Sequence, residues 1–389
     1  MQPRARLMAT LKGETVDRPP LSFYELNGLD ENPGGKDPFN IYSHPSWAPL
    51  IELTRERTDR IVMRPVGFKG APADPLAELT FRRTWVESEG VGFPNSEVPT
   101  GRQFTHSTIT YAGCTLTALT RRDMDVNTVW HLEHLLKNSA DLQVYLQLPQ
   151  PEFGGEPDIA LVLAAEQAIG DSGIVMIDLA DPLCLAAELF DMSNYLVVAL
   201  TEPALFHRLL DRFAAIIYPK VEAVARALPG RLWRIVGPEY ASPPFLPPRL
   251  FREFVTRYDT PIVQAIQRYG GFARMHSHGR LKLILDHILE TGCDGLDPIE
   301  PPPQGDMELS EVRQRYGEQL VLFGNLEVSD IENLPTVEFE RKVKAALEQG
   351  TTGNGRGFVL MPSSCPYGRV LSPLTLQNYR RMVEIVEEF

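Results

Sequence analysis

Two histidines separated by one residue are the strongest chemical signal in this sequence. His276 and His278 lie in the segment Met-His-Ser-His-Gly, which follows a short apolar run. If the backbone there is extended, alternate side chains point to the same side, so the two imidazoles face one region. Gly279 lets the chain turn away directly after them. Imidazole nitrogen is a good ligand for zinc, so the pair is a candidate for part of a metal site.

Cys365 is the thiol best suited to complete such a site. It is one of four cysteines, and it follows a later apolar run in the segment Met-Pro-Ser-Ser-Cys-Pro. Three protein ligands leave a fourth position open, which is the arrangement of catalytic zinc. We therefore predict a zinc site of His276, His278 and Cys365. The residues alone leave open the alternative that the histidine pair is structural and that Cys365 is an inert loop thiol.

Apolar segments alternate with helix-like segments over most of the chain, which predicts parallel strands joined by right-handed crossovers. The expected strands are 61–64, 173–178, 232–236, 272–276, 295–299, 320–324 and 358–361. This number favours an α/β fold of the (β/α)8 TIM-barrel type over an open doubly wound sheet. Residues 1–150 are less regular and form an elaborated N-terminal region, in which 81–86 and 103–119 alternate like a hairpin.

Chemistry in a TIM barrel lies at the carboxyl ends of the strands. Asp178, Glu239 and Asn325 end or follow predicted strands, as the histidine pair does. We expect Glu239 to be a fourth zinc ligand or a proton donor, and Asp178 to orient the reacting groups. We expect Tyr24 and Glu25 to reach the pocket from the N-terminal region and to contact the substrate together with Asn325. Each of these residues has a structural alternative, in which it holds loop backbone or belongs to the core.

The composition excludes several classes of partner. The chain has 389 residues, with 51 acidic against 38 basic residues and a net charge of −13. This balance argues against nucleic acid and anionic membranes as partners, since both attract basic patches. We expect no membrane span and no signal peptide, because no apolar run is long enough. The few, widely spaced cysteines then favour a reduced, cytoplasmic protein.

Other familiar motifs are missing or lie in the wrong place. The sequence contains no serine-nucleophile elbow, P-loop, dinucleotide fingerprint or HExxH motif. The glycine-rich segment 353–357 precedes a predicted strand, so it is interpreted as a loop rather than a phosphate cradle. The corrinoid-carrier motif DxHxxG is also missing, so we expect the chain not to carry its own cobalamin through such a histidine.

The sequence resembles the uroporphyrinogen decarboxylase superfamily, and within it the zinc-dependent, corrinoid-linked methyltransferase branch. The resemblance covers nearly the whole chain and is carried by Arg4-Ala5-Arg6, Lys12-Gly13-Glu14, Asp17-Arg18-Pro19-Pro20, His276-Ser277-His278-Gly279, Gly324-Asn325-Leu326, Cys365-Pro366 and Ser372-Pro373-Leu374-Thr375. It implies a single barrel domain over residues 1–389, with 1–150 packed on the barrel. It also implies Zn²⁺ as a cofactor and a corrinoid, free or on a partner protein, as the methyl acceptor.

Two departures from the family patterns suggest a direction for the reaction. The decarboxylases carry a Phe-Ser-Asp segment, which is missing here, and this argues against porphyrinogen decarboxylation. Thiol-methylating members show His-x-Cys…Cys, whereas His278 takes the middle position in this chain. Zinc with two imidazoles and one thiolate keeps a net positive charge, so it polarises an oxygen better than it activates a thiol. We therefore expect the donor to be a small methoxylated molecule.

Three alternatives remain open from the sequence. They are a decarboxylase-like lyase without metal, a methylcobalamin:thiol methyltransferase, and a non-catalytic barrel that binds a partner. The content of bound metal separates the methyltransferases from the other two. The sequence leaves the oligomeric state open, and a homo-oligomer is compatible with it.

Overall fold

A curled sheet of seven parallel strands forms the centre of the protein. The computed structural model describes residues 1–87 and 101–389. The strands follow the order β1-β8-β9-β10-β11-β12-β13. Their bounds are β1 (Arg60–Arg64), β8 (Gly173–Ala180), β9 (Leu232–Val236), β10 (Phe272–His276), β11 (Gly295–Asp297), β12 (Val321–Leu326) and β13 (Gly357–Pro362). All seven predicted strands are confirmed, with ends that differ by a few residues, and the α/β fold is of the predicted TIM-barrel type.

An eighth extended segment, residues 20–23, lies between the last strand and the first. Leu21 pairs in parallel with Leu360 of β13, whose N–H donates to the carbonyl of Pro20 at 2.9 Å. On the other side, the N–H of Asp59 donates to the carbonyl of Leu21 at 2.7 Å. These bonds connect β13 to β1 and close the barrel. This extended segment was not predicted, because four residues are too few to show the alternation of apolar and polar residues that marks a strand.

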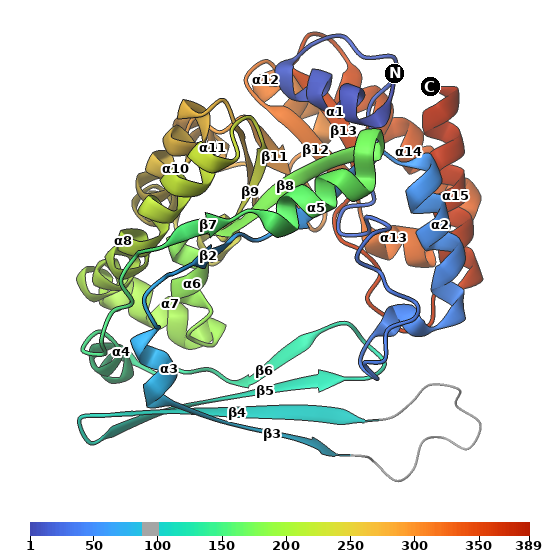
Figure 1. Ribbon diagram of the computed structural model, residues 1–389. Helices are drawn as coiled ribbons and strands as arrows, with labels where there is room; N and C mark the ends of the chain where they lie inside the picture. The colour runs from blue at the N-terminus through green and yellow to red at the C-terminus, as the bar shows by residue number, and fades with distance from the viewer. Residues whose placement is uncertain (88–100) are drawn as a thin grey trace.

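Helices lie around the sheet, most of them on its outside (Figure 1). They are α1 (Pro3–Lys12), α2 (Ala48–Arg57), α3 (Pro75–Leu79), α4 (Ser139–Tyr145), α5 (Ala160–Ile169), α6 (Pro182–Ala187), α7 (Met192–Thr201), α8 (Pro203–Ala227), α9 (Pro248–Phe251), α10 (Arg257–Arg268), α11 (Leu285–Glu290), α12 (Leu309–Tyr316), α13 (Val328–Asn333), α14 (Thr336–Thr351) and α15 (Pro373–Glu388). Among the described residues, no helix is both long and apolar enough to cross a membrane.

The barrel interior is apolar at the amino-terminal end of the strands and polar at the other end. Alternate strand residues face inward, and at the amino-terminal end they form a buried apolar cluster that includes Leu7 and Leu11 of α1. Its strand members include Ile174, Met176, Val321, Phe323, Val359 and Met361. The same alternation continues towards the carboxyl ends of these strands. It places Asp178 two residues after Met176 in β8, and Asn325 two residues after Phe323 in β12. The fold therefore brings the predicted polar residues to the carboxyl end.

An antiparallel sheet of four strands forms a separate layer below the barrel in Figure 1. Its strands are β3 (Thr80–Glu87), β4 (Arg102–Tyr111), β5 (Cys114–Asp123) and β6 (Val129–Glu133), and a small sheet pairs β2 (Gly67–Lys69) with β7 (Glu156–Asp158). The predicted hairpin is confirmed in part, because 103–119 turns at Ala112 and Gly113 into two strands. Backbone hydrogen bonds tie the segments on either side of β6 to the loops that follow β13 and α6.

A fragment that begins near residue 155 is expected not to fold cooperatively by itself. It would lack β1 and residues 20–23, which leaves the edges of β8 and β13 without their partners in the barrel. The expected result is a fragment with no cooperative urea transition, followed by circular dichroism. A sharp transition like that of the full chain would contradict the prediction that residues 1–389 form one domain.

Candidate metal and substrate site

His276 and His278 lie side by side at the carboxyl end of β10, with ring centroids 4.6 Å apart. Nδ1 of His276 is 2.7 Å from Oδ2 of Asp297, and Nδ1 of His278 is 2.8 Å from Oε1 of Glu300. A carboxylate that accepts from Nδ1–H fixes the tautomer, so the Nε2 lone pair faces outward as a ligand. Each histidine therefore has a carboxylate on one ring nitrogen, as metal-binding histidines usually do, while the other nitrogen is left for a metal.

Asp297 is held by a cation as well as by the histidine. Its side chain is fully buried, and Oδ1 lies 2.9 Å from Nε of Arg274, which is also buried. Burial raises the pKa of Asp297, but the charges of Arg274 and His276 outweigh burial, so the pKa is lowered. Asp297 is therefore ionised at neutral pH and orients the imidazole of His276.

Several carboxylates lie around His278. Burial opposes its charge, but the hydrogen bond and charge of Glu300, with the charge of Glu239, raise the pKa of His278. Glu239 lies in a 3₁₀ helix at Pro238–Ala241, directly after β9, and its Oε2 accepts from the N–H of Gly237 at 3.2 Å. Glu327 follows β12, and burial followed by the charge of Glu300 raises its pKa to about 7. Glu327 can therefore hold or release a proton near neutral pH.

Tyr24 connects His276 to a second polar network. Its hydroxyl oxygen lies 3.5 Å from both ring nitrogens of His276 and accepts from Nη1 of Arg234 at 2.6 Å. Nε of Arg234 donates to Asp178 at 2.7 Å, and Oε1 of Glu25 lies 3.6 Å from the same guanidinium. Arg234 thus joins three of the predicted site residues, Tyr24, Glu25 and Asp178, beside the histidines.

Cys365 belongs to the same network through Glu25 rather than through the histidines. Its Sγ donates to Oε2 of Glu25 at 3.6 Å. Burial first, and then the charge of Glu25, raises the pKa of the Cys365 thiol, so the sulfur is protonated in this arrangement. Within residues 1–87 and 101–389, no three His, Cys, Asp or Glu side chains are grouped to hold a metal ion. Of the three predicted zinc ligands, the two histidines therefore lie together, and the thiol of Cys365 is not beside them.

Asn325, the remaining predicted residue, occupies an inward position near the end of β12. Its Cα is paired with that of Met361 in β13, and its side chain is 8% exposed. The amide is therefore at the carboxyl end of the barrel, where a substrate could contact it.

Two fully buried carboxyl groups, Asp181 and Asp259, lie next to each other near the turn that carries Glu239. Oδ1 of Asp181 accepts from the N–H of Cys184 at 2.5 Å, and a Cβ on Gly237 would lie 2.0 Å from that oxygen. Only glycine therefore fits at this contact. Asp259 of α10 is the second group, and both side chains are fully buried. Burial raises the pKa of both, and the charge of Asp259 further raises that of Asp181.

The replacement Asp259→Asn is expected to stabilise the protein at pH 8. A carboxyl group whose pKa is higher in the folded than in the unfolded protein does not reduce the free energy of unfolding below about pH 4. Above that pH it reduces the free energy of unfolding increasingly as the pH rises. The amide has no such cost, so the free energy of unfolding should rise by about 1–3 kcal/mol at pH 8 and by less at pH 5. Urea unfolding of both proteins at the two pH values measures this. An equal change at both would contradict it.

Arg234 and Arg274 link the predicted residues but were not predicted from the sequence. Both lie at alternate positions of short, otherwise apolar strands, which is where inward-facing residues lie. A charged residue at such a position was the available signal. Asp297 and Glu300 lie at or after a predicted strand end, the position at which site residues were expected, but neither was assigned a role.

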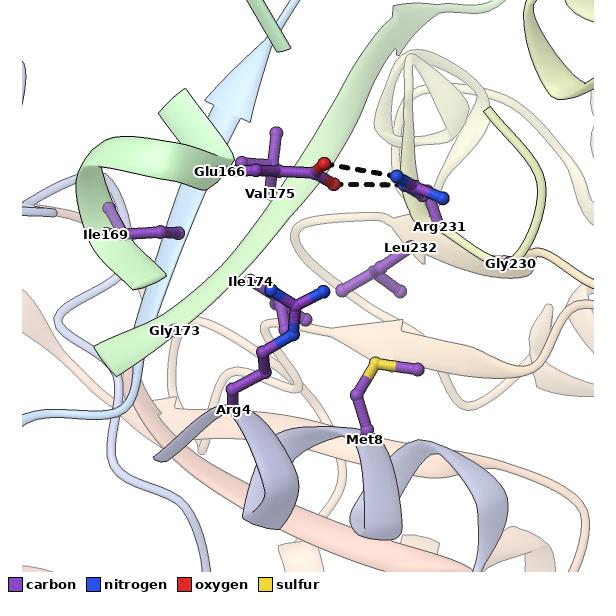
Figure 2. Close-up of a pocket in the computed structure, with 10 residues that line it drawn as sticks. All are labelled: Arg4, Met8, Glu166, Ile169, Gly173, Ile174, Val175, Gly230, Arg231 and Leu232. Carbon is purple, nitrogen blue, oxygen red and sulfur yellow. Dashed lines mark hydrogen bonds and ion pairs between the residues drawn. The ribbon is translucent and has the colours of Figure 1, made fainter. Parts of the chain in front are cut away.

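The pocket in Figure 2 lies at the opposite end of the barrel. Gly173 and Leu232, the first residues of β8 and β9, line it, and Arg4 and Met8 of α1 cover it. Glu166 and Arg231 form an ion pair across one wall, with oxygen–nitrogen distances of 3.0 and 3.1 Å. Its volume is about 100 Å³. The amino-terminal end of a TIM barrel serves stability, so we assign no chemistry to this pocket.

Comparisons with known proteins place the chain in a family. The family model described as uroporphyrinogen decarboxylase (URO-D) matches residues 159–389, which is more than half of the chain. A solved structure described as a methyltransferase from Methanosarcina mazei is similar over 100% of this chain and 99% of its own, with a TM-score of 0.59 and 16% identity. At that identity the likeness shows the fold alone. No curated protein matches the chain.

Proposed function

Because the chain belongs to the uroporphyrinogen decarboxylase family, we propose that it is a zinc-dependent methyltransferase. It moves a methyl group from a small, methoxylated donor to a corrinoid, either free cobalamin or the cofactor of a partner protein. The observation that carries this proposal is the pair His276 and His278, each with Nδ1 held by a carboxylate. A barrel mouth that presents two outward Nε2 atoms suits a metal better than a purely structural contact.

His276, His278 and Cys365 are the residues that would hold the zinc ion. The networks around the histidines contain five carboxylates but only two guanidiniums. The guanidiniums belong to Arg234 and Arg274, and the carboxylates to Asp178, Glu239, Glu300, Asp297 and Glu25. This excess of negative charge favours a divalent cation. Cys365 must exchange its contact with Glu25 for the metal, and it would lose its proton on binding. When bound, zinc acts as a Lewis acid on the oxygen that leaves the methyl group.

The chain's own residues would position the donor. Because Arg234 donates to the oxygen of Tyr24, the phenol O–H can itself donate a hydrogen bond to an oxygen of the methyl donor near His276. Asp178 holds Arg234 in place, and Asn325 supplies an amide from the end of β12. Glu239, beside His278, is the proposed proton donor to the leaving oxygen or a further metal ligand. Such fixed groups lower the barrier by orientation and by stabilising developing charge.

The arginines argue against the decarboxylase-like alternative. A lyase that acts on a polycarboxylate needs cations that are free to bind substrate carboxylates. Arg234 is already paired with Asp178 and Arg274 with Asp297, at 2.7 and 2.9 Å. Both guanidiniums therefore have internal partners.

A methyl-transfer assay tests the proposal. The zinc-loaded protein is mixed with chemically reduced cobalamin and a panel of methoxylated aromatic and aliphatic compounds. The expected result is methylated cobalamin, seen by absorbance, and a demethylated alcohol or phenol in equal amount. Transfer from methylcobalamin to thiols, without demethylation of any compound, would assign the protein to the thiol-methylating alternative.

The replacement His278→Cys separates the two directions of transfer. A second thiolate neutralises the zinc site, so the Lewis acidity towards oxygen falls while a bound thiolate becomes more nucleophilic. Demethylation is expected to slow by about tenfold or more, and methyl transfer to thiols to rise. Unchanged rates in both assays would contradict the charge argument.

A further inference from the structure

The antiparallel sheet of β3 to β6 has one face towards the rest of the protein and one face that the described chain leaves open. Ile109 of β4 and Leu116 of β5 are paired, are 8% and 3% exposed, and belong to the larger hydrophobic core. Residues that alternate with this pair point to the opposite side, which we name the outer face. Figure 1 shows no described helix or strand on the side of the sheet away from the barrel.

A row of aromatic and arginine side chains crosses the outer face. Its four members are paired in register from β3 to β6, and they are Trp85, Phe104, Arg121 and Trp130. The rings of Trp85 and Phe104 are stacked with centroids 5.4 Å apart, and the guanidinium of Arg121 lies 5.9 Å from the ring centroid of Trp130. Trp130 and Phe81 are 43% and 68% exposed. Because Trp, Phe and Arg are enriched in protein interfaces, this row has the composition of a binding surface.

The charges of the outer face are nearly balanced, although the chain as a whole carries a net charge of −13. Among the described residues, four cations and three carboxylates lie on this face, namely Arg83, Arg102, Arg121 and Lys137 with Glu87, Asp123 and Glu133. Several of them are paired within the sheet, such as Asp123 with Arg121 at 3.0 Å. Two copies of an acidic protein repel each other over most of their surface. The outer face is where they approach each other with little of that repulsion.

Arg83 and Glu87 make the outer face complementary to a second copy of itself. Both are exposed and lie on the outer face of β3, two residues before and two residues after Trp85. Trp85 holds both side chains, because Arg83 lies over its ring at 5.6 Å and Glu87 accepts from its Nε1 at 2.9 Å. A two-fold axis along the aromatic row reverses the strand direction of the second copy. It therefore sets Arg83 of each copy opposite Glu87 of the other.

The outer face is large enough for a specific dimer. The four strands have 8, 10, 10 and 5 residues. At the usual spacings, such a sheet measures about 30 Å by about 17 Å. Two of these faces together bury roughly 1,000 Å², which reaches the lower end of the range for specific interfaces. An interface of this size fits a dimer that dissociates in the micromolar range.

We propose that the outer face of the sheet is the interface of a homodimer, in which two copies pack face to face about a two-fold axis along the aromatic row. Trp85 and Trp130 supply apolar contacts, and the reciprocal pairs of Arg83 with Glu87 fix the orientation of the two copies. The interface is independent of the proposed methyl transfer, because no residue of the candidate site belongs to this sheet.

Sedimentation equilibrium of the full chain at concentrations from about 1 to about 100 µM tests the proposal. The wild type is expected to dimerise reversibly in this range. Trp130→Ser should weaken dimerisation by at least about tenfold, because it removes an exposed aromatic anchor. Leu161→Ser is the matched control, since Leu161 is 66% exposed on α5, and it should dimerise like the wild type. A wild type that stays monomeric, or Trp130→Ser that dimerises as strongly as the wild type, would overturn the proposal.

Exchange of the two charges tests the two-fold geometry. Arg83→Glu and Glu87→Arg each set like charges opposite one another, so each variant alone should dimerise more weakly than the wild type. An equimolar mixture of the two variants should form dimers again, because two acidic side chains of one copy then face two basic side chains of the other. The variant that carries both replacements should also dimerise. A mixture that is no more dimeric than the separate variants would overturn the proposed arrangement.

Discussion

Asp297→Leu is expected to lower the free energy of unfolding by about 3–5 kcal/mol, because it leaves a buried cation without its partner. Arg274 is 1% exposed and lies 2.9 Å from Asp297, so water cannot replace the carboxylate without opening the barrel. The same replacement removes the group that holds Nδ1 of His276. Urea unfolding at pH 7 measures the loss.

The double replacement Arg274→Met with Asp297→Leu provides the control. It exchanges the buried ion pair for apolar side chains, and such exchanges are often close to neutral. Most of the lost stability should therefore return, while His276 remains without its carboxylate. A single replacement that costs less than about 1 kcal/mol, or a double replacement that costs as much as the single, would contradict the role given to the pair.

His276→Ala is expected to remove most of the bound zinc and to slow methyl transfer at least about 100-fold. Loss of an outer partner of a metal ligand typically costs 10–100-fold, and loss of the ligand itself costs more. His287→Ala is the matched control, because that histidine lies on α11 beside Glu290 at 3.4 Å and outside both networks of the site. Metal content and the cobalamin assay on the three proteins measure the effect. Full zinc content in His276→Ala would contradict the assignment.

The sequence was sufficient to predict the strands because their apolar segments are bounded by prolines, glycines and charged residues. Seven strands were predicted on this basis. Residues 20–23 were not, because their place between β13 and β1 depends on three backbone hydrogen bonds to residues far away in the sequence. The barrel is closed by contacts between distant segments, and the hydrophobic periodicity within one segment does not predict such contacts.

The candidate site was predictable where it follows the strand ends and not where it depends on side-chain pairing. His276, Asp178 and Asn325 follow from their positions at the ends of apolar segments. The role of Arg234 as the centre of a network does not, since a single arginine within an apolar strand has no visible partner in the sequence. The contact of Cys365 with Glu25 joins residues 340 positions apart, and no spacing rule anticipates it.

X-ray absorption at the zinc edge of the purified, zinc-loaded protein identifies the atoms that hold the metal. We expect one zinc per chain with two nitrogen ligands at about 2.0–2.1 Å and one sulfur ligand at about 2.3 Å. The sulfur contribution should disappear in Cys365→Ser, and it should remain in Cys293→Ser, which changes another buried thiol outside the site. A protein that binds no zinc, or one whose spectrum is the same in wild type and Cys365→Ser, would contradict the assignment of the metal to His276, His278 and Cys365.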